Sequence, residues 1–251
     1  VCTALFCAPG VKVCEGEDAY KQCNAEGEAF DAPVNCQNTE SCSLGECLSL
    51  CAQAEAAPST IGCSFIASRV DNIFGNETDS LVVGNTSKTK TATVQLYFTP
   101  TGSNVEQAQG APVALMPGKT HAYSMTNPPF DKVSGLRKGG NYRVQSNIPI
   151  IAYQHSPITG QATNDASLLF PEHALKSDYV IASWLDSHNN YPSYFNVIAI
   201  EDGTTVKWTP SQNTIAGTGV AAVAAGQTGQ VAMNRFDTMQ VRANFGGDLT
   251  G

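Results

Sequence analysis

The sequence predicts a mainly β protein, in which a small disulfide-rich N-terminal module precedes two tandem antiparallel β-sandwich repeats of about 100 residues, the second incomplete. All nine cysteines fall within the first 63 of the 251 residues. After them, short runs of β-branched and aromatic residues alternate with turn formers. One segment of the β region also recurs later in the chain. The predicted boundaries are a module at 1–57, a linker at 58–63, and sandwiches at 64–175 and 176–251.

Composition narrows the class of protein. Hydrophobic residues make up 42% of the chain, enough for a packed core, while charged residues make up 14%, well below the roughly 25% of ordinary soluble domains. No apolar run approaches the roughly 18 residues of a membrane-spanning helix. The net charge of −8 lacks the excess of Lys and Arg that neutralises phosphates, so we expect no nucleic-acid partner and no membrane span.

The cysteines indicate an oxidising compartment. They are separated by 4, 6, 8, 12, 5, 4, 3 and 11 residues, and no histidine precedes His121, so the paired two-residue intervals of a zinc site are missing. We therefore expect disulfides rather than zinc, no cofactor, and an extracellular or cell-surface location. Nine is odd, so one cysteine stays free or pairs with another molecule, and we choose Cys63. The pairing stays open among Cys2, Cys7, Cys14, Cys23, Cys36, Cys42, Cys47, Cys51 and Cys63.

The module is also acidic. It carries Lys12 and Lys21 against nine acidic residues, a net charge of −7, whereas residues 64–251 carry a net charge of −1. Gly45–Ala57 is rich in Leu and Ala, which predicts a short helix that carries Cys47 and Cys51 one turn apart. Ala54–Thr60 contains a proline and is interpreted as a linker.

From Cys63 onward the apolar residues recur with a period of two. Many short strands with little helix between them predict an antiparallel sandwich or barrel rather than a βαβ fold. The clearest hairpin is predicted at Glu201–Gly203, because Asp-Gly tolerates the positive φ of a tight turn. The predicted strands are Leu81–Val83, Ala92–Phe98, Pro112–Leu115, Tyr142–Gln145, Pro149–Tyr153, Tyr179–Trp184, Tyr194–Ile200, Thr205–Trp208 and Gln230–Met233.

An internal repeat supports two similar units. Val113–Met125 aligns with Ala221–Met233 at an offset of 108 residues, and both contain a Gly-x-Thr turn. The chain stops at Gly251, where the counterparts of the strands at Tyr142–Tyr153 should begin. We therefore expect either a fragment of a longer polypeptide or a second sandwich completed by a neighbouring subunit. The lack of a signal peptide before Cys2 likewise predicts a removed leader or a late start.

Several strand-and-turn segments resemble a known family. They are Ser146–His155, Ser167–His173, Asp178–Trp184, Ser193–Val206 and Gly247–Gly251. Together they resemble the N-terminal domain of the IgG Fc-binding protein family, over about residues 64–251. The resemblance implies a surface protein of bacterial, myxobacteria-like source, and a further strand after the last turn. Relatives often carry cysteines in the β region, which this chain lacks, and neither antibody binding nor any catalytic residue is carried over.

The chemistry-bearing residues lie close together in sequence. His155, His173 and His188 fall within 34 residues of one another, together with Asp165, Asp178 and Asp186. If the loops meet at one end of a sandwich, His155, Asp165, Asp186 and His188 are the candidates for a metal or glycan site. The alternative is that these residues only form turns. None of the common hydrolase, P-loop or calcium-loop motifs is present.

Two sequons, at Asn76 and Asn85, are candidates for N-glycosylation in a eukaryotic secretory pathway. Chance matches are common in a chain this rich in Asn, Ser and Thr. Because the resemblance favours a bacterial source, we expect both asparagines to carry no sugar.

These observations favour a non-enzymatic extracellular protein, a component of a surface layer, fibre, sheath or adhesin that acts through contacts with other proteins or copies of itself. The alternative is a glycan- or protein-binding module with a loop-end, metal-dependent site, and a secreted hydrolase comes third. An incomplete second sandwich would also leave an unpaired strand edge. We therefore expect subunits to touch through strand edges near Gly226–Gly251, by β-augmentation.

Overall fold

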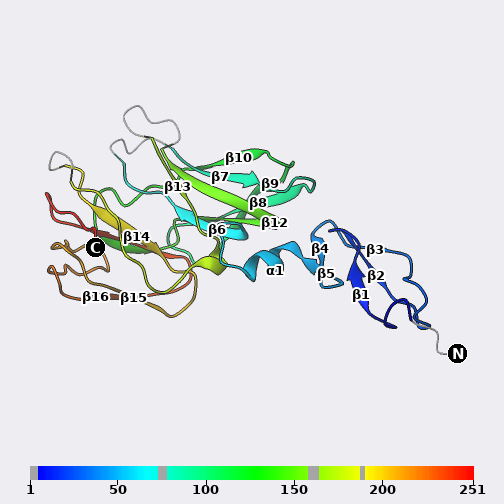
Figure 1. The fold of residues 1–251 in the computed structure, drawn as a ribbon. Coiled ribbons are helices and arrows are strands. Elements are labelled where there is room, and N and C mark those ends of the chain that lie inside the picture. Colours follow the sequence, from blue (N-terminus) through cyan, green and yellow to red (C-terminus); the bar gives the residue numbers. More distant parts are fainter. Residues whose placement is uncertain (1–4, 73–77, 158–163, 187–189) are drawn as a thin grey trace.

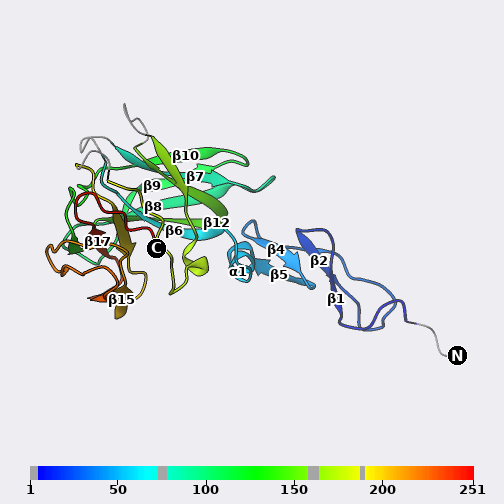
Figure 2. The ribbon, with the colours of Figure 1, turned by 60° about the vertical axis from the view of Figure 1, so that its left-hand side comes forward.

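The computed structural model describes residues 5–72, 78–157, 164–186 and 190–251. A small module extends away from a larger β body, and one short helix lies between them (Figures 1 and 2). The mainly β class predicted above is confirmed. The elements of the module are β1 (Lys12–Cys14), β2 (Ala19–Gln22), β3 (Val34–Asn35), β4 (Glu40–Ser43), β5 (Glu46–Ser49) and α1 (Leu50–Glu55).

Disulfides hold the module together, as predicted. Its two small sheets, β1-β2-β3 and β4-β5, bury few side chains. Cross-links substitute for a core in a domain this small. The choice of Cys63 as the unpaired cysteine is wrong, because Cys63 bonds to Cys51, while Cys2 lies outside the described residues. The four disulfides are Cys7–Cys23, Cys14–Cys42, Cys36–Cys47 and Cys51–Cys63.

The predicted helix is shorter than expected. It begins after Ser49, whose hydroxyl accepts a hydrogen bond from the Ala52 amide at 3.4 Å, a typical N-cap. The first part of the predicted range forms β5, since Leu44 and Gly45 adopt positive φ and turn the chain into the β4–β5 hairpin. Cys47 therefore lies on a strand and Cys51 on the helix.

The first β unit is built around one long strand, β12. Its N-terminal half pairs with β8 and β6, and its C-terminal half pairs with β7 and β13. This change of partners lets two layers share β12 and enclose a core that includes Phe65, Leu81, Val94, Val144 and Ile150. The strands are β6 (Gly62–Ser68), β7 (Asp79–Asn85), β8 (Ala92–Thr99), β9 (Gln107–Leu115), β10 (Thr120–Met125), β12 (Asn141–Ser156) and β13 (Asp165–Leu168).

The second β unit has its own core. The sheet β11-β17-β14 lies against the hairpin β15-β16, with Met239 and Val241 of β17 buried against Met233 of β16. The 3₁₀ turn η1 (Glu172–Ala174) lies between the units in sequence. The strands are β11 (Gly135–Lys138), β14 (Tyr194–Ile198), β15 (Thr204–Trp208), β16 (Gly229–Met233) and β17 (Asp237–Arg242).

Four predicted features differ from the structure. The turn at Gly203 has the expected positive φ of 69°, but β14 pairs with β17 and β15 with β16, so the predicted hairpin is wrong. The predicted strand Tyr179–Trp184 has no ladder partner among the described residues and is not a strand. In addition, β6 begins at Gly62, inside the predicted linker, and β11 belongs to the second sheet although it precedes residue 176.

The two copies of the internal repeat share one structural feature, the turn at their aligned glycine. Gly118 and Gly226, aligned in the sequence, adopt φ of 70° and 74°, and each precedes a strand, β10 and β16. The segments before the turns differ, because Val113–Leu115 belongs to β9 whereas residues 221–224 form no strand. The two tandem sandwiches therefore stay a prediction. Among the residues that the structure describes, no helix has the length and hydropathy to cross a bilayer.

Candidate functional site

The predicted loop-end residues that the structure describes, His155, Asp165 and Asp186, are not part of a group placed to hold a metal ion. His155 lies on β12 opposite Ala166 of β13, and Asp165 pairs with the next residue of β12. His188 lies outside the described residues. Within the described ranges no group of three or more His, Cys, Asp or Glu side chains is placed to hold a metal ion.

Asp186 instead organises the loop that contains it. One carboxylate oxygen accepts hydrogen bonds from the amides of Asn190 and Tyr191, at 3.1 and 2.9 Å. The other accepts from the amide of Gly246 at 2.9 Å. These are the bonds of a turn-forming residue, which is the alternative to a ligand role that the sequence left open.

Of the two predicted sequons, the structure describes the one at Asn85. Asn76 lies outside the described residues. Asn85 is 3% exposed, and its side-chain amide donates hydrogen bonds to the carbonyls of Lys90 and Leu115 at 2.9 and 2.7 Å. A glycan attached to that nitrogen would take the place of one of its two N–H donors and would need room that a 3% exposed side chain does not have, so the folded chain offers no acceptor at Asn85.

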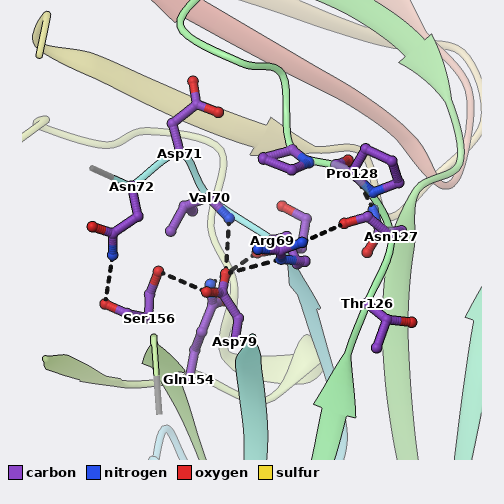
Figure 3. A network of polar contacts seen from close by, with 12 residues as sticks. Arg69, Val70, Asp71, Asn72, Asp79, Thr126, Asn127, Pro128, Gln154 and Ser156 are labelled. Atoms are coloured by element: carbon purple, nitrogen blue, oxygen red, sulfur yellow. Dashed lines mark hydrogen bonds and ion pairs between the residues drawn. The ribbon is translucent and has the colours of Figure 1, made fainter. Parts of the chain in front are cut away.

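A buried polar network lies where the chain leaves β6 (Figure 3). Asp79 is 1% exposed and forms an ion pair with Arg69, with 3.9 Å between Nε and Oδ2. The same carboxylate accepts hydrogen bonds from the Val70 amide at 3.1 Å and the Ser156 hydroxyl at 3.2 Å. Arg69 in turn donates to the Asn127 carbonyl at 3.1 Å. The network thus connects β6, β7 and β12 with the loop that follows β10.

Asp71, which lies two residues after Arg69, connects this network to the second unit. Its carboxylate accepts hydrogen bonds from the amides of Asp131 and Lys132, at 2.7 and 2.6 Å. Both of these residues adopt positive φ, which aims successive amides at one anion. Gln240 of β17 also donates to the carboxylate at 2.7 Å, and Tyr194 of β14 donates to the Asp71 carbonyl at 2.7 Å. The joint between the two units is therefore polar and specific.

Tyr194 acquires a shifted pKa at this joint. Burial, followed by the negative charges of Asp71 and Asp79, raises the pKa of the phenol above its ordinary value of about 10. The fold therefore holds the neutral phenol, the form that can donate to the Asp71 carbonyl.

The stability of the chain should consequently fall as the pH rises above about 10, where an unfolded tyrosine loses its proton but the folded one retains it. Stability from this group is complete below that pH. Tyr194→Phe should flatten the pH dependence of the unfolding free energy by up to about 1.4 kcal/mol per pH unit. Urea unfolding between about pH 9 and 11 measures it, with Tyr20→Phe, at a half-buried tyrosine of the disulfide-rich module, as the control. Equal slopes for wild type and Tyr194→Phe would contradict the assignment.

The most unusual surface of the body is an exposed apolar segment before β14. We call Asp178–Leu185 the apolar edge. Val180 is 86% exposed and Trp184 is 84% exposed, and Tyr179 and Leu185 are exposed by more than half. Large apolar side chains this exposed and this close together mark interaction surfaces rather than chance exposure.

In the part of the chain that the structure describes, the backbone of the apolar edge is hydrogen-bonded to Thr250 and Gly251. Ile181 accepts a hydrogen bond from the Gly251 amide at 2.9 Å, and the Ser183 amide donates to the Thr250 hydroxyl at 3.1 Å. The Ser183 hydroxyl donates to the Tyr194 carbonyl at 3.0 Å, which fixes the segment beside β14. The exposed side chains are thus presented by an anchored segment.

A shallow cleft of about 260 Å³ opens between the layers of the first unit. Phe98 and Tyr142 stack there with ring centroids 4.7 Å apart. The cleft combines aromatic, amide and hydroxyl groups. Its lining residues are Leu96, Phe98, Gln109, Ser124, Thr126, Asn127 and Tyr142.

Sequence reasoning missed the polar joint and the cleft. In the sequence, the joint is visible only as three charged residues near strand ends, Arg69, Asp71 and Asp79. Charged residues make up only 14% of the chain. That scarcity was the available signal, since a charge kept beside an apolar strand is usually paired. The apolar edge was identified, but as a strand.

Comparison with known proteins supports the resemblance for part of the chain. A family model described as IgGFc binding protein matches residues 165–251. The resemblance is therefore confirmed from β13 to the end, while its extension back to residue 64 and a myxobacteria-like source stay predictions. A comparison with curated proteins finds no match. The crystal structure of Thermotoga maritima 1070 is similar at 16% identity and a TM-score of 0.32, over 44% of this chain and 95% of that one, which carries no argument about function.

Proposed function

We propose that this chain is a non-enzymatic extracellular protein that acts through contacts with other proteins, as a component of a surface layer, fibre, sheath or adhesin. Four disulfides suit an oxidising compartment outside the cell. The segment that matches the IgGFc binding protein model agrees with a protein-binding or structural role. The exposed side chains of the apolar edge are the observation that carries the proposal, because a protein that worked alone would gain nothing from exposing Val180 and Trp184.

Fractionation of the native source tests this proposal. An antibody against the chain should find it in the surface or matrix fraction, within an assembly larger than one chain that denaturant releases. An intracellular protein detected in parallel is the control for lysis. Recovery of the chain as a free species inside the cell would contradict the proposed function.

A glycan-binding role is the second candidate, favoured by the cleft of the first unit. Carbohydrate sites combine an aromatic face with amide and hydroxyl groups that bond the sugar hydroxyls, and Phe98, Gln109 and Ser124 supply these groups. If the cleft binds glycans, the chain should bind to a glycan array, and Phe98→Ala should lower the affinity by about tenfold or more. Val105→Ala, at an exposed site outside the cleft lining, is the control. Equal binding by the two variants would exclude the cleft as the site.

A further inference from the structure

We infer that two copies of this chain pair through the apolar edge, as antiparallel strands related by a twofold axis at Ala182. The inference deepens the proposed function, on which it rests, by naming the contact and the partner. The segment is already extended, since no turn or bend occurs from Asp178 to Asp186. Among the described residues it has no ladder partner.

The backbone of the apolar edge has free hydrogen-bonding groups on one side. The odd-numbered residues Ile181 and Ser183 direct their backbone groups to Thr250 and Gly251. Backbone groups alternate in direction along an extended chain, so those of Val180, Ala182 and Trp184 point the opposite way. No hydrogen bond within the described part of the chain engages them. Such a row of unpaired groups is a template for another strand.

The sequence of the edge is complementary to itself about Ala182. Antiparallel pairing there places Val180 opposite Trp184 of the second copy, and Tyr179 opposite Leu185. Aromatic side chains opposite β-branched or aliphatic ones are favourable cross-strand pairs. The same register makes Val180, Ala182 and Trp184 the residues that exchange hydrogen bonds, and these are the residues with free backbone groups. A longer ladder would bring Asp178 opposite Asp186, so carboxylates limit it at both ends.

The available area is sufficient for a specific dimer. The exposed portions of the four large side chains of the edge amount to roughly 500 Å² per copy. Two copies together therefore bring roughly 1,000 Å² of exposed apolar side chain to the contact, divided between the two faces of the ladder, before the backbone is counted. On one face Trp184 then packs against Val180 of the second copy, and on the other face Tyr179 packs against Leu185, so each exposed aromatic side chain gains an apolar neighbour.

Light scattering coupled to gel filtration tests the pairing on the chain of residues 1–251. The wild type should elute with the mass of two chains. Val180→Lys with Trp184→Lys should give the mass of one chain, because the twofold axis brings lysine opposite lysine, and should raise the dissociation constant by on the order of 100-fold or more. Val180→Lys with Trp184→Glu should restore the dimer, since each lysine then faces a glutamate.

Val105→Lys is the matched control, at a 70% exposed valine elsewhere on the body, and should leave the dimer intact. Circular dichroism checks that each variant folds. A wild type with the mass of one chain, or a lysine–glutamate variant that stays monomeric, would overturn the inference. Such a failure is distinct from failure of the proposed function, because the chain could still be found in a surface assembly built on other contacts.

A cysteine at the axis gives an independent test. Hydrogen-bonded antiparallel neighbours have Cα atoms about 5.5 Å apart, within the range that a disulfide bridges. Ala182→Cys should therefore form a cross-linked dimer on mild oxidation, seen on a non-reducing gel. Val105→Cys, which also retains Cys2, should not. Equal cross-linking in the two variants would show random collision and would count against the axis.

Discussion

Replacing Asp79 by alanine is expected to lower the free energy of unfolding by about 3–5 kcal/mol. The carboxylate is 1% exposed and balances the charge of Arg69, whose side chain is 8% exposed. Its removal leaves a buried guanidinium without that counter-charge, and leaves the Val70 amide and Ser156 hydroxyl without their acceptor. For a fold with a total stability of about 5–15 kcal/mol, a loss of this size is severe.

The matched control for Asp79→Ala is Asp18→Ala. Asp18 pairs with Lys90 at 2.7 Å, a shorter distance than in the buried pair, but the side chain of Asp18 is 67% exposed. Its removal should cost less than about 1 kcal/mol, because water reaches the exposed carboxylate and screens the pair, although the side chain of Lys90 itself is 17% exposed. Urea unfolding of the two variants shows whether the loss of unfolding free energy follows the burial of the ion pair or the distance between its two charged atoms.

A double-mutant cycle sharpens this test. If Arg69 and Asp79 act as a pair, Arg69→Ala with Asp79→Ala should cost clearly less than the sum of the single changes, because the second substitution removes the charge that the first left unbalanced. Additive losses in the cycle, or similar losses for Asp79→Ala and Asp18→Ala, would show that the buried pair is not a unit.

Features of this fold that depend on residues close together in sequence could be predicted, whereas features that depend on contacts between distant residues could not. Strands with a clear period of two were found, because alternation reports one buried face. Pro149 made one strand look like two, since proline cannot donate to a ladder. In the structure it lies inside β12, where the register to β6 shifts between Gln145 and Ile150, and a missing amide is tolerated there.

Strand partners were beyond local reasoning. The Asp202-Gly203 turn was identified, yet the strands on either side pair with β17 and β16. A turn fixes the local path of the chain, whereas the pairing is decided by which apolar faces can be buried together. The same limit applies to the polar joint, because no pattern near Asp71 shows that Gln240, 169 residues away, will donate to it.

The Cys51–Cys63 disulfide should matter more for the arrangement of the protein than any other cross-link. It joins α1 of the module to β6 of the body, and Cys51 Sγ lies 3.7 Å from the Ser146 carbonyl of β12. With both cysteines replaced by alanine, the module should stay folded but lose its fixed position. The chain between α1 and β6 should then be cut faster by proteases, and small-angle scattering should show a broader range of molecular dimensions.

The Cys7–Cys23 disulfide provides the control, because its sequence separation of 16 is close to the 12 of Cys51–Cys63 while it lies wholly inside the module. On the basis of chain entropy alone, each of the two disulfides stabilises the fold by about 3 kcal/mol. Removing either disulfide should therefore destabilise the protein to a similar degree. The location of the effect should differ: loss of Cys7–Cys23 should loosen the module and leave residues 56–61 as resistant to proteases as in the wild type. If both double variants are cut there equally fast, then Asp18–Lys90 and the packing of Leu50 on the body, rather than the disulfide, position the module.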